Sequence, residues 1–157
     1  MKTEKIAADI AESVVEKDNE ITLSTGVKLS LKRVNSYAYI EFQRKHKKPK
    51  PPVVFLEEHG REQENPDNPD YIEQLEQWNT ERMMGIIDIT LILGTECTHV
   101  PAGIPKMDSD SWLESLAVAF GGDIVFKNNK ERYLWWLKYI ASTDEDIAKI
   151  ATKVALS

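Results

Sequence analysis

The sequence predicts a mainly α-helical protein with a small N-terminal β-hairpin, an α+β fold built as a compact helical domain around one long central helix. A helix-start signal followed by a long apolar stripe, in residues 69–94, predicts the central helix. Alternating apolar and polar residues around a Ser-Thr-Gly turn, in residues 21–31, predict the hairpin. We expect residues 21–157 to form a single helical domain with the hairpin at 21–34. Residues 1–20 are expected to form an N-terminal amphipathic helix or a flexible arm.

The composition is that of a folded soluble protein. Of 157 residues, 41% are hydrophobic and 29% charged, which argues against disorder, and this length favours one domain. The net charge of −6 repels a phosphate backbone, so we expect no nucleic-acid partner. The most apolar run, residues 86–93, is far shorter than the roughly 20 residues that cross a bilayer, so we expect no membrane partner. A single cysteine, Cys97, excludes an intrachain disulfide and fits a reducing, cytoplasmic location.

The N-terminal half is predicted as short elements joined by turns. Gly26 is expected to supply the positive φ of the hairpin turn. A helix is predicted over residues 35–47, and the sequence Lys-Pro-Lys-Pro-Pro at 48–52 is typical of a stiff, extended connector. Residues 53–56 are predicted as a short strand, and residues 57–67 as a loop.

The central helix has clear start and stop signals. Asn68 is placed to cap it, Pro69 suits the first helical position, and Gly94 is a plausible stop. Gly85 is its weak point, costing up to about 1 kcal/mol relative to alanine. Asp88 lies in the apolar half, where an unpaired charge is costly; we expect it to reach a cation, with Arg132 as one candidate, or the helix surface, rather than to act as a catalytic acid.

The C-terminal half is predicted as a loop over residues 95–107 followed by three helices. The first helix, at 109–119, is expected to be capped by Asp108 or Ser109 and to end at Gly121. The second spans residues 130–141. The third is expected to start at Ser142 or Thr143, with Glu145 and Asp146 at capping-box spacing. The side chains expected to face inward from the first helix are Trp112, Leu113, Leu116 and Phe120.

The residues that usually carry chemistry form no recognisable site. Cys97 and His99 could donate two metal ligands, but a structural zinc site needs four. As a nucleophile and base they lack an orienting partner. We therefore expect no catalytic residue, no metal and no cofactor. Residues 44–50 form a basic cluster that could contact phosphates, although a solvated helix end explains it better.

The sequence Arg-Tyr-Leu-Trp-Trp-Leu-Lys-Tyr, at residues 132–139, is unusually aromatic for one helix. Trp135 and Tyr139 share one face at i, i+4 spacing, and Trp136 lies on another. One face should belong to the core. The other is either a partner surface, since Trp and Tyr are enriched at binding hot spots, or buried between neighbouring helices.

Taken in order, these segments resemble the tail assembly chaperones of long, non-contractile-tailed bacteriophages. The resemblance rests on the hairpin, the connector at 48–52, the sequence Glu-Asn-Pro-Asp-Asn-Pro-Asp-Tyr at 64–71, and the motifs in residues 94–96, 100–105, 112–113 and 132–139. It covers residues 21–154.

The resemblance implies a non-catalytic helper of tail morphogenesis in the host bacterial cytoplasm. Such proteins bind the tape measure protein and help recruit the tail tube protein, and self-association is a further option. The residues expected to bind partners are Trp135, Tyr139, Trp112 and Tyr71. Three other classes stay open from the sequence: a structural tail or neck component retained in the virion, a small enzyme, and a nucleic-acid-binding regulator using residues 44–50.

Overall fold

The computed structural model describes residues 19–155, which divide into two compact units. Unit 1 contains the described residues up to Val34 together with residues 88–155, and unit 2 is Asn35–Ile87. The predicted helix or arm at residues 1–20 lies outside the described residues, except for its last two. The single domain expected over residues 21–157 stays a prediction, because a compact unit need not fold alone.

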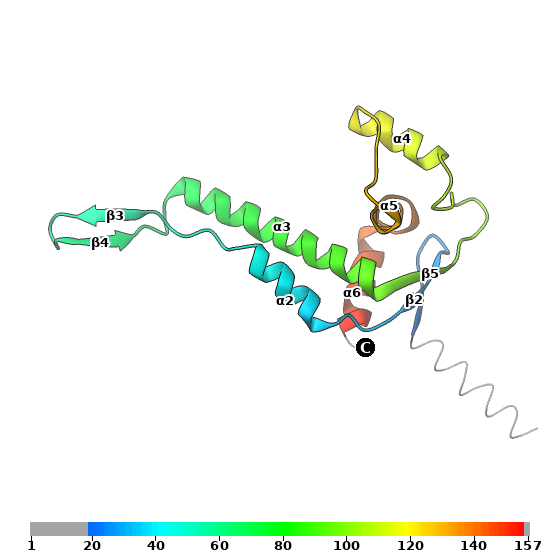
Figure 1. Cartoon of the computed structure of the whole chain (residues 1–157), viewed down its shortest axis with the longest axis horizontal. Coiled ribbons are helices and arrows are strands. Elements are labelled where there is room, and N and C mark those ends of the chain that lie inside the picture. The colour runs from blue at the N-terminus through cyan, green and yellow to red at the C-terminus, as the bar shows by residue number, and fades with distance from the viewer. Residues whose placement is uncertain (1–18, 156–157) are drawn as a thin grey trace, which may run out of the picture. The chain divides into compact units, whose positions relative to one another are not determined.

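Unit 1 contains a three-stranded antiparallel sheet with β2 at its centre. Its strands in spatial order are β1 (Glu20–Thr22), β2 (Lys28–Leu31) and β5 (Thr95–His99). The first two form the predicted hairpin, with Ile21 opposite Leu29. Gly26 in its turn has φ of 92°, a left-handed conformation that glycine adopts without a Cβ clash, as predicted. The mainly α fold with an N-terminal hairpin is therefore confirmed (Figure 1).

Strand β5 corrects the sequence analysis, which predicted a loop from residue 95 onward. It pairs antiparallel with the second edge of β2, so that Leu29 lies opposite Cys97 and Leu31 opposite Thr95. The sequence Thr-Glu-Cys-Thr-His has no alternation of large apolar residues, so it carries no local strand signal. The strand forms because the hairpin offers it an unpaired edge, which is a tertiary effect.

The helices after β5 are α4 (Ser111–Phe120), α5 (Asn129–Trp136), the π-helical segment η1 (Leu137–Ala141) and α6 (Asp144–Ala155). The predicted helix over residues 130–141 is thus α-helical at first and π-helical at its end. Hydroxyl groups satisfy the carbonyls of that wide last turn: Ser142 Oγ donates to the Leu137 carbonyl at 2.5 Å, and Thr25 Oγ1 to the Ala141 carbonyl at 2.6 Å. No local residue pattern predicted this π turn.

Gly94 ends the central helix, α3 (Pro69–Gly94), by close packing. Its φ is not left-handed, unlike a typical glycine C-cap. A Cβ atom at Gly94 would lie 3.0 Å from Val34 Cγ2 and 3.1 Å from Val154 Cγ1, and both valines are buried. Only a residue without a side chain lets these segments approach so closely.

We expect Gly94→Ala to lower the free energy of unfolding by about 1–3 kcal/mol, because the added methyl group overpacks a buried site. Alanine's helix preference of up to about 1 kcal/mol offsets only part of this loss. Urea denaturation of both proteins measures the difference. Gly122→Ala is the matched control, since a Cβ atom there meets nothing within 4 Å. A Gly94→Ala protein as stable as the wild type would contradict the packing argument.

In unit 2 the start of α3 follows the predicted signal. The Asn68 side chain accepts a hydrogen bond from the Tyr71 amide at 3.1 Å, which caps the helix, and Pro69 occupies the first helical position. The helix then runs to Gly94 without a break, as predicted (Figure 1).

Helix α2 (Ser36–Lys45) packs against α3 within unit 2. The Phe42 ring lies directly over Gly85, where a Cβ atom would come within 2.2 Å of Phe42 Cζ. Near the end of α2, Trp78 Nε1 donates to the His46 carbonyl at 3.2 Å. The His46 ring donates from Nε2 to the Trp78 carbonyl at 3.1 Å, since a carbonyl can only accept. Gly85, whose low helix propensity was expected to weaken α3, therefore leaves the space that the Phe42 ring occupies.

A second hairpin in unit 2 consists of β3 (Val53–Leu56) and β4 (Arg61–Glu64). Strand β3 was predicted, but β4 lies in the segment predicted as a loop. All four residues of its sequence, Arg-Glu-Gln-Glu, are exposed, and there is no apolar alternation to mark a strand. It is extended because the chain reverses at Gly60, whose φ is 58°, and pairs with β3.

Candidate partner-binding surface

Helix α5 and its continuation η1 present two different faces. Trp136 is 1% exposed and Leu137 is fully buried, so one face belongs to the core of unit 1. Trp135 is half-buried and Tyr139 is 46% exposed, so the other face reaches the surface. The alternative in which both faces are buried within the chain is therefore wrong.

The exposed face is part of an aromatic patch, defined as Phe120, Phe126, Trp135 and Tyr139. Trp135 lies at its centre, with ring centroids 5.8 Å from Phe120, 5.7 Å from Phe126 and 5.4 Å from Tyr139. Phe120 also meets Tyr139 edge-on at 5.8 Å. These separations lie in the favourable range for aromatic pairs, so the chain assembles the patch without a partner.

The outer rings of the aromatic patch are open to solvent. The outer rings are Phe120, which is 57% exposed, and Tyr139. Phe126 and Trp135 are half-buried. Two valines close by in the sequence, Val118 and Val125, are almost completely exposed. Single exposed apolar residues are common on soluble proteins, but a cluster of them usually marks an interaction site.

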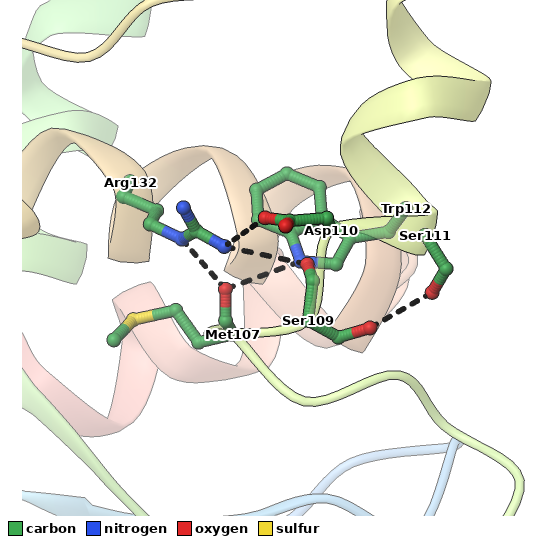
Figure 2. Close-up of polar contacts among 6 residues, drawn as sticks. All are labelled: Met107, Ser109, Asp110, Ser111, Trp112 and Arg132. Carbon is green, nitrogen blue, oxygen red and sulfur yellow. Dashed lines mark hydrogen bonds and ion pairs between the residues drawn. The ribbon is translucent and has the colours of Figure 1, made fainter.

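A loop before α4 is fixed to α5 by donors aimed at its backbone carbonyls (Figure 2). Arg132 donates from Nε to the Met107 carbonyl at 2.7 Å and from Nη2 to the Ser109 carbonyl at 3.3 Å. Trp112 Nε1 donates to the same Met107 carbonyl at 3.2 Å, and the Arg132 guanidinium lies 5.6 Å from the centre of the Trp112 ring. Because α4 begins at Ser111, this network places α4, and with it Phe120, beside α5.

The start of α4 differs from the prediction. Neither Asp108 nor Ser109 caps the helix; the N-cap is Asp110, whose side chain makes no capping hydrogen bond. Its carboxylate instead lies 3.7 Å from Arg132 Nη2, and Ser109 Oγ pairs with Ser111 Oγ at 2.9 Å. The local capping groups are therefore used in other contacts.

The partner predicted for Asp88 is also wrong. Arg132 is held by the loop carbonyls, and Lys138 forms the ion pair, with its Nζ 2.9 Å from Asp88 Oδ1. Both side chains are largely shielded from solvent. Asp88 thus reaches a cation, as expected, but that cation belongs to η1.

Trp112 and Tyr71 were also expected to bind partners. Trp112 is 2% exposed and supports the aromatic patch from below, with its ring centroid 6.1 Å from that of Phe126. Tyr71 is buried as well, within unit 2. Neither ring can present a contact surface in this conformation, so the candidate surface keeps only Trp135 and Tyr139 of the four predicted residues.

Phe120 and Phe126 were not predicted as surface residues. Phe120 was expected to face inward with Trp112, but eight residues of an α-helix turn a side chain about 80° from its starting direction. The inward stripe of α4 therefore rotates toward Trp135 by the end of the helix. The apolar run Ile124-Val125-Phe126 after two glycines was the available signal for the second ring.

A pocket of about 250 Å³ lies beside β5 and is lined in part by Cys97, Tyr133 and Trp136. Burial raises the pKa of the Tyr133 hydroxyl to about 12, although its hydrogen bond with Thr95 Oγ1, at 2.7 Å, opposes this. Burial also raises the pKa of the Cys97 thiol, which disfavours the nucleophilic thiolate. The thiol donates to the His99 backbone carbonyl at 3.7 Å.

Two further candidates from the sequence are a metal site and the basic cluster at residues 44–50. Among residues 19–155, no three His, Cys, Asp or Glu side chains come together in a way that could hold a metal ion. In the basic cluster, Arg44 and Lys45 lie 3.3 Å and 3.7 Å from the carboxylate of Glu41 on the same helix. Such exposed pairs are typical of a solvated helix end.

Comparison with family models, curated proteins and solved structures found no match to this chain. Within the described part of the chain, no helix has both the length and the apolar character needed to cross a membrane.

Proposed function

We propose that this chain is a tail assembly chaperone of long, non-contractile-tailed bacteriophages. In this role it is a non-catalytic protein of the host bacterial cytoplasm that engages the tape measure protein and helps recruit tail tube subunits. The ordered motifs of the sequence support the family. The observation that carries the binding role is the aromatic patch, with Phe120 and Tyr139 open to solvent on a pre-assembled base.

The aromatic patch suits the partner that this role requires. A chaperone for a long, helical, aggregation-prone protein needs apolar surface that is open before binding and covered afterwards. Rings held in place by neighbouring rings lose little side-chain freedom on binding, which favours affinity. Co-expression with the neighbouring tape measure protein, followed by pull-down, is the direct test of this role.

Replacing both Phe120 and Tyr139 with alanine is expected to weaken tape-measure binding at least about thirtyfold, the loss of one aromatic anchor worth about 2 kcal/mol, and about a thousandfold if both rings are such anchors and their losses add. The melting temperature should change little, because both rings are about half exposed. Titration of the purified proteins measures the affinity. Tyr37→Ala is the matched control: it removes a ring that is 75% exposed on α2, outside the aromatic patch. Unchanged binding by a folded double variant would remove the aromatic patch from the interface.

A structural tail or neck component retained in the virion is the alternative. Mass spectrometry of purified particles separates the two functions, because a chaperone is released before the particle matures. Detection of this chain at stoichiometric amounts in mature virions would replace the chaperone by a structural role.

The double variant Cys97→Ala/His99→Ala is expected to support the same yield of infectious particles as the wild type. The thiol has a raised pKa, which disfavours the nucleophilic thiolate, and it donates to the His99 backbone carbonyl. Plaque counts after complementation of a deletion phage measure the outcome. Loss of infectivity with a soluble, folded variant would favour a catalytic function.

A further inference from the structure

The β3–β4 hairpin is a strand pair without a packed face. Three of the four β3 residues are exposed, with Val53 at 56% and Phe55 at 59%, and every residue of β4 is exposed. An isolated two-stranded hairpin is at best marginally stable in water, and an apolar edge strand invites pairing with another chain. The hairpin thus has features of an interaction element.

The register shows which backbone groups of the hairpin are open. The Asn65 amide donates to the Pro52 carbonyl at 2.8 Å, so the pair at 52 and 65 is a hydrogen-bonded one. Hydrogen-bonded pairs alternate along an antiparallel ladder, and the next is Val54 with Gln63. The amide and carbonyl groups of Val53 and Phe55 therefore point away from β4. Pro52 has no amide hydrogen, but its nitrogen faces β4, so the outer edge of β3 does not lose a donor there.

The two edges of the hairpin differ in charge. The residues of β3 are all uncharged, whereas Glu62 and Glu64 occupy the equivalent outward positions on β4. Pairing β4 with β4 of another copy would bring these carboxylates opposite each other, which is destabilising. The β3 edge can accept a strand, and the β4 edge rejects a copy of itself.

We propose that the β3 edge pairs with the β3 edge of a second copy of this chain around a two-fold axis. The outward amide and carbonyl of Val53 would form hydrogen bonds with those of the partner's Phe55. Val54 would lie opposite the partner's Val54 at the axis. The apolar side chains of Val53 and Phe55 from both copies would then cover one another on one face. The resulting four-stranded sheet has β4 on both outer edges, whose charges stop further strand addition.

Charge-swapped variants test this register. Two lysines at positions 53 and 55 place like charges opposite each other in the dimer, as do two glutamates at the same positions. Each variant alone is expected to dimerise about tenfold more weakly or worse in analytical ultracentrifugation, and an equimolar mixture should recover a heterodimer. Tyr37→Lys, which places a charge at an exposed site on α2, should dimerise like the wild type.

A disulfide test fixes the axis. In a Cys97→Ser background, Val54→Cys should form a covalent dimer on mild oxidation, because facing residues in a non-hydrogen-bonded antiparallel pair have Cβ atoms about 4.5–5.5 Å apart. Val53→Cys should link much less, since it faces position 55 of the other copy. A wild-type chain that stays monomeric at high concentration overturns the proposal. So does a dimer that both charge variants leave intact, or equal linking by the two cysteine variants.

Discussion

Trp136→Ala is expected to lower the free energy of unfolding by about 3–5 kcal/mol, the usual loss when a large buried aromatic ring is truncated. Trp136 is 1% exposed, and its indole Nε1 donates to the Pro105 carbonyl at 2.7 Å. The substitution therefore opens a cavity and leaves a loop carbonyl without its donor. Urea denaturation at neutral pH, followed by far-ultraviolet circular dichroism, measures the loss.

The variant Trp136→Phe separates the contribution of the buried ring from that of the hydrogen bond to Pro105. Phenylalanine keeps most of the apolar volume but cannot donate to the Pro105 carbonyl, so its loss should be smaller than that of the alanine variant. Removing a donor from a fully buried acceptor typically costs about 1–3 kcal/mol, and the loss here should lie toward the lower end because this hydrogen bond is only part-buried. Tyr139→Ala, on the exposed face of the neighbouring turn, should cost much less than either. If Trp136→Ala were no more destabilising than Tyr139→Ala, the assignment of the two faces would be wrong.

The sequence left open whether the Trp135 face is exposed, but it placed Trp135 and Trp136 on separate faces because helical spacing is a local property. The same holds for α3, whose start depends on Asn68 and Pro69 and whose length follows from a sustained apolar stripe. Local chemistry also predicted the Gly26 turn and a cap at Ser142 or Thr143, of which Thr143 is the one observed. Such features need only residues within a few positions of one another.

The features that the sequence did not predict depend on distant partners. Strand β5 exists because β2 has an open edge, and β4 because the turn at Gly60 returns the chain to β3. Arg132 could not be assigned to the carbonyls of Met107 and Ser109, because backbone acceptors have no sequence signature. The Phe120 ring contacts Trp135 and Tyr139, residues of another helix that no local pattern assigns to it, and it remains 57% exposed.

Asp146 joins the start of α6 to the hairpin turn. Replacing Asp146 is expected to lower the free energy of unfolding about as much as replacing Trp136. Its carboxylate accepts hydrogen bonds from the Ser24 hydroxyl at 2.6 Å, the Ser24 amide at 3.0 Å and the Thr143 amide at 3.0 Å. The Asp146 amide in turn donates to Thr143 Oγ1 at 3.3 Å, which completes a capping box with aspartate in the usual glutamate position. The side chain is 3% exposed, so water cannot replace these bonds.

We expect Asp146→Ala to lower the free energy of unfolding by about 3–5 kcal/mol, since hydrogen bonds to a charged group contribute about 1.5–3 kcal/mol each and are not additive. Asp146→Asn should lose less, because its Oδ1 can still accept from the Ser24 amide. Its amide group would, however, face the Thr143 amide, donor against donor. Asp144→Asn is the control: it changes an exposed carboxylate in the same helical turn and should cost less than about 1 kcal/mol.

The same carboxylate should make stability depend on pH in acid. Burial alone would raise the pKa of Asp146, but the hydrogen bonds from Ser24 and Thr143 outweigh it and lower the pKa below its ordinary value of 3.8. Between the folded and unfolded pKa values the unfolded chain binds more protons, so stability rises with pH there. The contribution of Asp146 is therefore complete well above pH 3.8 and is lost as the pH falls through the folded-state value.

Because this contribution is lost in acid, the free energies of unfolding of the wild type and Asp146→Asn should become more similar as the pH falls. The difference in their free energies of unfolding should be constant from neutral pH down to about pH 5 and should narrow at lower pH, because asparagine cannot be protonated there. Urea titrations at a series of pH values, with Asp144→Asn alongside, measure this difference. If the difference in free energy of unfolding stayed constant well below pH 3.8, the stabilisation by Asp146 would not depend on its charge. The packing of α6 against the hairpin turn would then be what stabilises this part of the fold.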